Sequence, residues 1–217
     1  MENRTVTIVD YGIGNLFSVE RALNHIGCKT VITSNADDVL KAERLILPGV
    51  GAFGEGMSNL KQAGIDESIK AFVALNRPLL GICLGMQLLM QESEEHGTHH
   101  GLGVFSGRVI RFHEQVSVGR RYKIPFIGWN ELNRHCDSKW SGTIMDSISQ
   151  YDAVYFVHSY IVIPTNAIDI LANTTYGKIT YCSVIYRDNI YGCQFHPEKS
   201  GEVGLKILSN FVNLGVL

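Results

Sequence analysis

The feature that most restricts the fold of this chain is a cysteine between two glycines, placed directly after an apolar run. Residues 78–87 read PLLGICLGMQ, so that Cys83 follows a segment typical of a buried strand and precedes a helix-forming one. Gly81 and Gly85 permit neighbouring elements to approach the backbone closely. This order predicts a sharp strand-to-helix turn with the Cys83 side chain at its apex, which is the geometry of a nucleophile elbow.

A cysteine at such a turn has two interpretations. The positive end of the following helix favours the thiolate form, which suits a catalytic nucleophile. A free cysteine can equally be a small apolar side chain buried in the core. The local pattern around Cys83 leaves both interpretations open.

A histidine and a carboxylate follow a β-rich run near the other end of the chain. Residues 190–195 are succeeded by His196, Pro197 and Glu198. In an extended segment, residues i and i+2 project to the same side, so His196 and Glu198 can lie together. Taken alone, a His-x-Glu segment is most often a surface strand end. A cysteine nucleophile, however, needs a base and a group that orients the base, and these residues supply both.

The first ninety residues alternate between predicted strands and helices. Strands are expected at 6–9, 29–33, 44–47 and 79–83. Helices are expected at 16–26, at 57–75 with a break near Gly64, and at 84–91. A βαβα order of this kind predicts a parallel sheet with helices on both faces.

The second half of the chain has a different pattern. β-rich segments predict antiparallel or mixed additions to the sheet, at 104–112, 153–162, 168–174, 180–187 and 190–195. A final helix is expected at about 202–213. The stretch 113–150 is polar and poorly periodic, and we expect it to hold loops and insertions. Since no repeat or linker interrupts the chain, we expect a single domain spanning residues 1–217.

The composition limits the class of protein. A hydrophobic content of 45% with a net charge of −2 is typical of a globular protein, and there is no basic excess for binding nucleic acid. The five cysteines include no C-x-x-C pair, which argues against a disulfide framework or zinc site and for a reducing compartment. No apolar run approaches the roughly 20 residues of a membrane helix, and no signal peptide begins the chain. We therefore expect a cytoplasmic protein without membrane or nucleic-acid partners.

Two further motifs have competing interpretations. Residues 49–54 (GVGAFG) fit the glycine pattern of dinucleotide-binding loops, but residues 70–74 (KAFVA) lack the carboxylate which that fingerprint requires about 20 residues later. This loop is better interpreted as a backbone that turns its N–H groups toward an oxyanion, with a plain turn as the alternative. His96, His99 and His100 lack companion ligands at metal-site spacing, and predict a solvated turn rather than a metal site.

Together these segments resemble a known family. GICLG at 81–85 and FHPE at 195–198 resemble the class I (triad) glutamine amidotransferases. Within this class, four more segments resemble the glutaminase subunits of imidazole glycerol phosphate synthases: DYGIGN at 10–15, LPGVG at 47–51, GWN at 128–130 and YFVHSY at 155–160. The resemblance covers nearly the whole chain, and the occurrence of all six segments in this order is specific.

The resemblance implies a fold and an activity. The fold would be α/β, a flavodoxin-like three-layer fold with a central mixed, mainly parallel sheet. The activity would be hydrolysis of glutamine to glutamate and ammonia, with Cys83, His196 and Glu198 as the catalytic triad and with no cofactor or metal. Because 217 residues leave no room for a synthase domain, the ammonia would be channelled to a separate (β/α)8 barrel cyclase/synthase subunit (HisF-like). In the resembled family this partner makes imidazole glycerol phosphate and AICAR in histidine biosynthesis.

The resemblance also implies roles for further residues. The oxyanion hole maps to Val50 or Gly51 and to Leu84. The predicted glutamine contacts are Gln87, Glu95, Ser159 and Tyr160. The predicted partner interface contains Asn15, Trp129 and Lys199. Three bland alternatives stay open: Glu95 as an exposed helix-end acid, Trp129 as a core aromatic, and His158 as a hydrogen-bonded core histidine.

One position departs from the resembled pattern. The chain has Phe126 after Pro125, where Pro-His is common before the Gly-Trp-Asn segment, and this lies beside a segment expected to face the partner. The alternatives are a paralogous subunit that supplies ammonia for amidination of a surface-glycan sugar, a non-catalytic binding subunit, and a stand-alone cysteine hydrolase such as a γ-glutamyl hydrolase. The sequence leaves the ammonia acceptor open.

Overall fold

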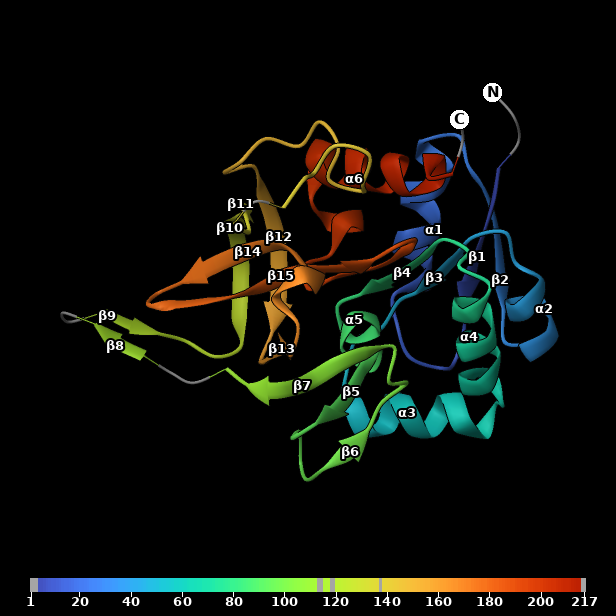
Figure 1. Cartoon of the computed structure of the whole chain (residues 1–217), viewed down its shortest axis with the longest axis horizontal. Coiled ribbons are helices and arrows are strands. Elements are labelled where there is room, and N and C mark those ends of the chain that lie inside the picture. The colour runs from blue at the N-terminus through green and yellow to red at the C-terminus, as the bar shows by residue number, and fades with distance from the viewer. Residues whose placement is uncertain (1–3, 113–114, 118–119, 137, 216–217) are drawn as a thin grey trace.

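A mixed β-sheet runs through the centre of the molecule (Figure 1). The computed structural model describes residues 4–112, 115–117, 120–136 and 138–215. Among these residues the strand order of the main sheet is β11-β14-β15-β16-β4-β3-β1-β2. Its strands are β1 (Thr5–Val9), β2 (Lys29–Thr33), β3 (Leu45–Leu47), β4 (Leu79–Ile82), β11 (Asn133–Arg134), β14 (Ile170–Tyr176), β15 (Ile179–Arg187) and β16 (Ile190–Cys193). The strands from β2 to β16 pair in parallel, and β11, β14 and β15 extend the sheet in antiparallel fashion.

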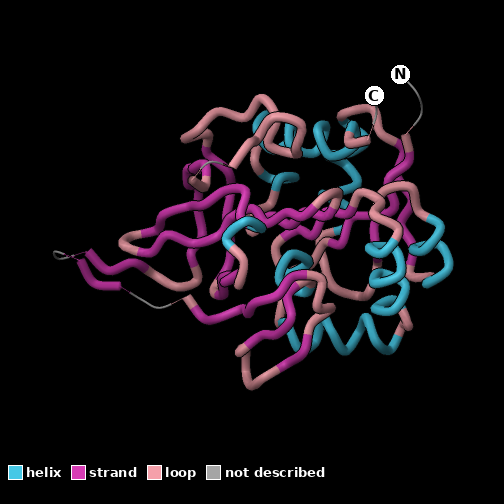
Figure 2. Tube along the Cα trace, in the orientation of Figure 1, coloured by secondary structure: helices cyan, strands magenta, loops and turns pink. Residues whose placement is uncertain are grey.

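Helices cover both faces of this sheet (Figure 2). One face carries α1 (Leu16–His25) and α6 (Gly201–Asn213), and the other carries α2 (Ala36–Lys41), α3 (Phe53–Gln62), α4 (Ile65–Ala74) and α5 (Leu84–Leu88). Successive side chains of β1 point to opposite faces of the sheet, and both faces are apolar. Ile8 belongs to the apolar core that includes α1 and α6, whereas Val9 belongs to the core that includes α3 and α4. The predicted three-layer, flavodoxin-like fold is therefore confirmed.

Smaller sheets lie beside the main one (Figure 1). A four-stranded sheet has the order β13-β7-β5-β6, formed by β5 (Met90–Ser93), β6 (His99–His100), β7 (Phe105–Arg111) and β13 (Tyr160–Pro164). Two hairpin-like pairs join β10 (Phe126–Glu131) to β12 (Ala153–His158) and β8 (Gln115–Ser117) to β9 (Arg120–Tyr122). The pair β8–β9 extends away from the main sheet at the left of Figure 1. Single 3-10 turns, η1 (Ala167–Asp169) and η2 (Pro197–Lys199), complete the described elements.

Most predicted elements are present, and the break at Gly64 separates α3 from α4 with φ +66°. The helix predicted to continue to residue 91 is wrong, because α5 ends at Leu88 and Met90–Ser93 form strand β5 instead. That strand pairs with β7, with Met90 opposite Phe105, so distant pairing prevails over local helix propensity. The predicted turn at the three histidines is wrong in part, because His99 and His100 form strand β6 against β5.

The stretch 113–150, predicted as loops and insertions, contains regular structure. Residues 113–114, 118–119 and 137 of this stretch lie outside the described residues. Strand β10 was missed because it is apolar on both sides: Phe126 faces the core, while Ile127 and Trp129 are exposed and hide the two-residue period.

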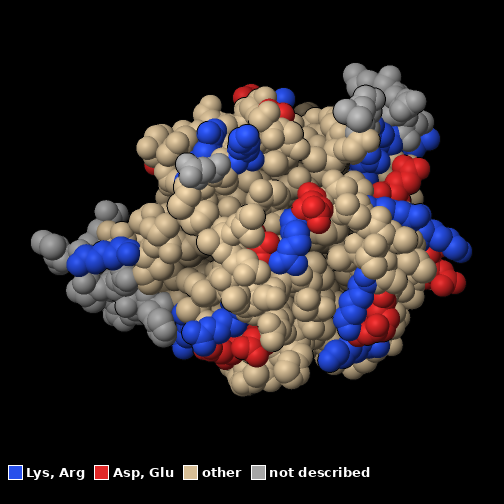
Figure 3. All heavy atoms as spheres, viewed as in Figure 1, with Lys and Arg blue, Asp and Glu red and all other residues tan. Residues whose placement is uncertain are grey.

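Charged side chains are dispersed over the surface. On the face seen in Figure 3, basic and acidic side chains are interspersed, without an extended basic area. Within the described ranges, no helix combines the length and the apolar character required to cross a membrane.

Candidate active site

The predicted sharp turn between β4 and α5 is present, with Cys83 at its apex. Cys83 has φ +53° and ψ −105°, a sparsely populated conformation for a non-glycine residue that costs about 1–3 kcal/mol. The glycines on either side are required by packing. A Cβ on Gly81 would lie 2.8 Å from the backbone of Gly85, and one on Gly85 would lie 1.8 Å from the Leu47 carbonyl oxygen. The core thus holds the cysteine in a strained, fixed position.

His196 and Glu198 form a buried pair. The Nδ1–H of His196 donates to Oε1 of Glu198 at 2.8 Å, and only 2% and 1% of the two side chains is exposed. The backbone N–H of His196 donates to the Tyr155 carbonyl at 2.9 Å, which ties η2 to β12. The remaining ring nitrogen, Nε2, makes no regular hydrogen bond to a described residue.

The electrostatics of this pair involve Cys83. Burial alone would lower the pKa of His196, but its interactions with the Cys83 sulfur and the Glu198 carboxylate outweigh burial and raise that pKa to about 10. The imidazole is therefore cationic at neutral pH. A cationic imidazole beside a cysteine sulfur is the arrangement that activates a cysteine nucleophile.

A chain of buried amides supports the thiol from the other side. Gln194 donates from Nε2 to Sγ of Cys83 at 3.7 Å, and Gln87 donates to Oε1 of Gln194 at 3.1 Å and to the Tyr160 carbonyl at 3.2 Å. Gln194 is fully buried. Gln194 was not predicted as a site residue, although its position two residues before His196 places it on the same side of the extended segment.

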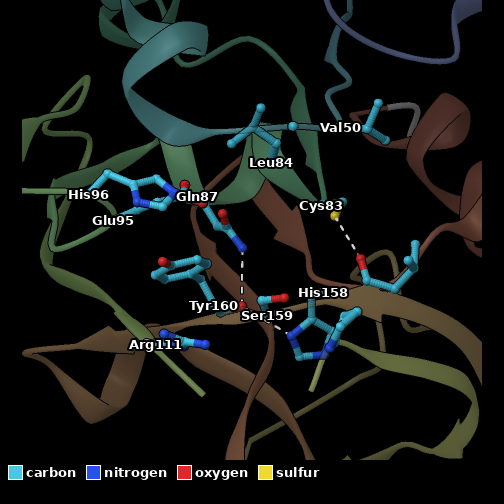
Figure 4. A pocket seen from close by; sticks show the side chains of 13 residues that line it. Val50, Cys83, Leu84, Gln87, Glu95, His96, Arg111, His158, Ser159 and Tyr160 are labelled. Carbon is cyan, nitrogen blue, oxygen red and sulfur yellow. Dashed lines mark hydrogen bonds between the residues drawn. The ribbon is translucent and has the colours of Figure 1, made fainter. Parts of the chain in front are cut away.

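A cavity of about 460 Å³ opens beside Cys83 (Figure 4). It brings together all the residues predicted for the oxyanion hole and for glutamine: Val50, Gly51, Leu84, Gln87, Glu95, Ser159 and Tyr160. It is also lined by residues that were not predicted to contact glutamine, namely His96, Arg111, Pro125 and Val157.

Glu95 is not an exposed helix-end acid. It is buried, follows strand β5, and accepts a hydrogen bond through Oε2 from the backbone N–H of Phe53 at 2.7 Å. Phe53 is the first residue of α3 and comes two residues after Gly51. Glu95 therefore fixes the end of the glycine-rich loop and also places negative charge on the cavity wall.

In the observed conformation of the glycine-rich loop, one of the predicted oxyanion donors, the Leu84 N–H, is already bonded within the protein. The backbone N–H of Leu84 donates to the Gly49 carbonyl at 3.3 Å, so it is not free to bind another oxygen. The Tyr11 hydroxyl donates to the Pro48 carbonyl at 2.7 Å, and a Cβ on Gly49 would lie 2.3 Å from that hydroxyl. The predicted oxyanion residues are therefore adjacent, but the hole is not formed in this arrangement.

His158 behaves as a hydrogen-bonded core histidine. Burial lowers its pKa to about 4, so the ring is neutral. In that form Nδ1–H donates to the Tyr160 carbonyl at 3.0 Å, and Nε2 accepts from the Tyr181 hydroxyl at 3.2 Å. Phe126 belongs to the same aromatic region and stacks on Tyr176 with 4.1 Å between ring centroids. The unusual phenylalanine thus points into the core, away from the exposed side of β10.

The three residues predicted for the partner interface all lie on the surface. Trp129 is 56% exposed and contacts Tyr155 edge to face, so the alternative of a core aromatic is wrong. Asn15 precedes α1 and accepts a hydrogen bond from the Ser18 N–H at 3.3 Å. Lys199 ends η2, and η2 contacts both α1 and β12, so the three residues belong to elements that pack together.

The chain is similar to known proteins over nearly its whole length. Residues 7–214 match the family model described as glutamine amidotransferase class-I. The chain is 44% identical over 211 residues to "Imidazole glycerol phosphate synthase subunit HisH 1" of Legionella pneumophila (strain Lens), covering 97% of this chain and 99% of that one. It is also 44% identical over 209 residues to the subunit HisH of Geobacillus thermodenitrificans (strain NG80-2), covering 96% and 95%.

Solved structures show the same fold. PurLQS from Thermotoga maritima aligns with a TM-score of 0.71 at 17% identity, covering 97% of this chain and 98% of that one. A glutamine amidotransferase from Thermotoga maritima aligns with a TM-score of 0.61 at 16% identity, covering 97% and 83%. At this level of identity the likeness extends to the fold alone.

Proposed function

The chain belongs to the class I glutamine amidotransferases, and on this basis we propose that it is the glutaminase subunit of an imidazole glycerol phosphate synthase, acting as a single domain over residues 1–217. Near-full-length similarity to HisH proteins supports the assignment to histidine biosynthesis. The observation that carries the catalytic part is the strained Cys83 between an open cavity and the buried His196–Glu198 pair.

In the first half-reaction, the Cys83 thiolate attacks the side-chain amide carbonyl of glutamine. The His196 imidazolium gives its proton to the departing nitrogen, so that ammonia leaves and a γ-glutamyl thioester remains on Cys83. Glu198 holds His196 in the tautomer and orientation for this transfer and stabilises its positive charge.

In the second half-reaction, water attacks the thioester carbonyl while the neutral His196 accepts a proton from it. The carbon–sulfur bond breaks, glutamate is released, and the thiolate–imidazolium pair is restored. Glutamine and water are thereby converted to glutamate and ammonia, and the balance requires no cofactor or metal.

The cavity wall supplies the substrate contacts. Glu95 binds the α-ammonium group of glutamine, with Ser159 and Tyr160 as further contacts. Gln87 acts chiefly as a structural support, because its amide group is already bonded to Gln194 and Tyr160. This is a smaller role than direct substrate binding.

The glycine-rich loop is the switch. Rotation of the peptide after Gly49 breaks its bond to Leu84 and turns the Val50 N–H toward the cavity, whereas the Gly51 N–H would require rotation of the next peptide. The freed Leu84 N–H and the reoriented loop N–H can then bind the oxyanion. Each such donor contributes about 3 kcal/mol to the transition state. In the free subunit the loop rests in the closed arrangement and glutamine hydrolysis is slow, because unused ammonia would be wasted.

The ammonia acceptor lies on a separate HisF-like (β/α)8 barrel subunit, which performs the ring closure to imidazole glycerol phosphate and AICAR. We place its docking face at Asn15, Trp129 and Lys199, where Trp129 offers a large exposed anchor. A heterodimer that acts in the cytoplasm follows from this proposal.

The test is to combine the purified chain with a barrel subunit and to measure glutamate and imidazole product. Glutamine should support product formation, and the barrel subunit with its acceptor substrate should stimulate glutamate release about a hundredfold, which requires about 2.7 kcal/mol of differential binding. Glutamate release coupled instead to amidination of a sugar would favour the paralogous function. The absence of glutamate release from the assembled complex would favour a non-catalytic binding subunit.

A further inference from the structure

The cavity beside Cys83 has two chemically different ends. The thiol lies at one end, and three ionisable side chains, Glu95, His96 and Arg111, lie together at the other (Figure 4). The proposed reaction uses the thiol end, and Glu95 is assigned to the α-ammonium group. Arg111 takes no part in the proposed steps of glutamine hydrolysis.

Arg111 is positioned by strand pairing. It is the last residue of β7 and lies directly opposite Tyr160 of β13, so the two side chains project from the same face of the sheet. Both line the cavity. The next residue also bonds to the segment that contains Tyr160, because the Phe112 N–H donates to the Ser159 carbonyl at 2.8 Å. Arg111 is therefore held at the cavity wall by the backbone of two predicted substrate contacts.

The charges at this end fit an amino-acid head group. Among the lining residues that the structure describes, Arg111 is the single lysine or arginine and Glu95 is the single carboxylate. Glu95 is held in place by its bond to the Phe53 N–H. A zwitterionic α-amino acid carries one cation and one anion on the same carbon, and a wall with one carboxylate and one guanidinium is complementary to it.

We propose that Arg111 binds the α-carboxylate of glutamine and, together with Glu95, selects an α-amino acid from other primary amides. The proposal rests on the glutaminase function proposed above. A guanidinium presents two parallel N–H groups that match a carboxylate, and charge-assisted bonds of this kind are roughly twice as strong as neutral ones. A site built for a charged group rejects analogues that lack the group.

The same strand provides a matched control. Arg108 lies three residues before Arg111, forms an ion pair with Glu94 at 2.9 Å, and does not line the cavity. An effect of losing positive charge on β7 in general would appear in Arg108→Ala as well. His96→Ala measures separately how much His96, which lies beside Glu95 and Arg111, contributes to glutamine binding.

The experiment measures kcat/KM of the subunit, assembled with its synthase partner, for glutamine and for 4-aminobutanamide, which is glutamine without its α-carboxylate. Arg111→Ala should lower kcat/KM for glutamine about a hundredfold, equivalent to about 2.7 kcal/mol, and for 4-aminobutanamide less than about threefold. Arg111→Lys should have a kcat/KM for glutamine about tenfold higher than that of Arg111→Ala, because lysine restores the positive charge but not the two parallel N–H groups of the guanidinium. Arg108→Ala should stay within about twofold on both substrates.

A third substrate, 4-carbamoylbutanoate, tests Glu95 in the same way. Glu95→Gln keeps an oxygen that can accept from Phe53, and it should affect glutamine far more than 4-carbamoylbutanoate, which lacks the α-ammonium group. Equal losses on glutamine and 4-aminobutanamide in Arg111→Ala, or no loss on either, would overturn the assignment of Arg111. Alkylation of Cys83 by iodoacetamide at the wild-type rate shows that the variant retains the site. If wild-type complex releases no glutamate, the proposed function fails, whatever Arg111 does.

Discussion

The elbow at Cys83 and the glycine-rich loop at residues 48–51 face the same cavity but are held in different ways. The elbow is fixed by backbone packing, because a single added carbon at Gly81 or Gly85 would collide with main-chain atoms. The loop is held mainly by two replaceable hydrogen bonds, from Tyr11 to Pro48 and from Leu84 to Gly49. One half of the site is thus preformed and the other half can change.

This difference separates chemistry from control. Packed cores change conformation at high cost, whereas a single hydrogen bond contributes about 0.5–1.5 kcal/mol net. A partner therefore needs little binding energy to rearrange the loop and could not easily rearrange the elbow. We expect regulation to act through the loop, with the nucleophile ready in both states.

The largest effect should come from removing the nucleophile. Cys83→Ala should lower glutamine-dependent product formation by at least about a thousandfold, since no other group can form the thioester. Product formation from added ammonium salt should stay near the wild-type rate, because the acceptor chemistry belongs to the partner. Loss of both activities at equal complex concentration would mean that Cys83 is structural. The division between a catalytic elbow and a regulatory loop would then be wrong.

The docking face should affect the loop without affecting the elbow. Trp129→Ala should weaken the complex about 30-fold, as for an interface anchor worth about 2 kcal/mol, and reduce the stimulation of glutamate release in parallel. Because Trp129 is largely exposed, the melting temperature of the free subunit should change little. Calorimetric titration and a thermal melt measure the two quantities.

A large drop in that melting temperature would instead mark Trp129 as a stabilising packing residue. Iodoacetamide alkylation of Cys83 in the free variant serves as the control and should be unchanged. A slower alkylation would show that this surface is coupled to the elbow as well.

A smaller effect should follow from loosening the loop directly. Tyr11→Phe removes the hydroxyl that binds the Pro48 carbonyl but keeps the aromatic ring. If this bond contributes about 1 kcal/mol to the closed loop, basal glutamine hydrolysis by the free subunit should rise about fivefold. The fully stimulated complex should be unaffected. A fall in basal activity would show that Tyr11 supports the active conformation, contrary to our view of the loop.

The smallest effect concerns pH and the buried His196. Its pKa is raised in the folded state to about 10, above the ordinary value of 6.5. The folded protein therefore binds this proton more tightly than the unfolded chain, and the stabilisation is complete below about pH 6.5 and is lost as pH rises toward 10. The free energy of unfolding from denaturant titrations should fall less over this range in His196→Ala than in the wild type. An identical fall in both proteins would contradict the raised pKa of His196.

The sequence was sufficient for features that depend on neighbours along the chain. The strand, the glycines and the helix around Cys83 are contiguous, and the spacing of His196 and Glu198 already places them on one side of an extended segment. The strand–helix alternation in the first half likewise follows from local periodicity. These parts of the fold and of the candidate triad were therefore predictable.

Only the tertiary structure decided the features that join distant segments. Strand β5 replaces a predicted helix because Met90 pairs with Phe105, and Arg111 reaches the cavity because it pairs with Tyr160. The bond from Leu84 to Gly49, which holds the glycine-rich loop, joins residues 35 positions apart. No local propensity encodes such contacts, because their energy depends on the packing of the whole sheet. The sequence by itself determined which groups are candidates for the chemistry, and the three-dimensional packing decided which of them lie together at the cavity and which are held in other hydrogen bonds.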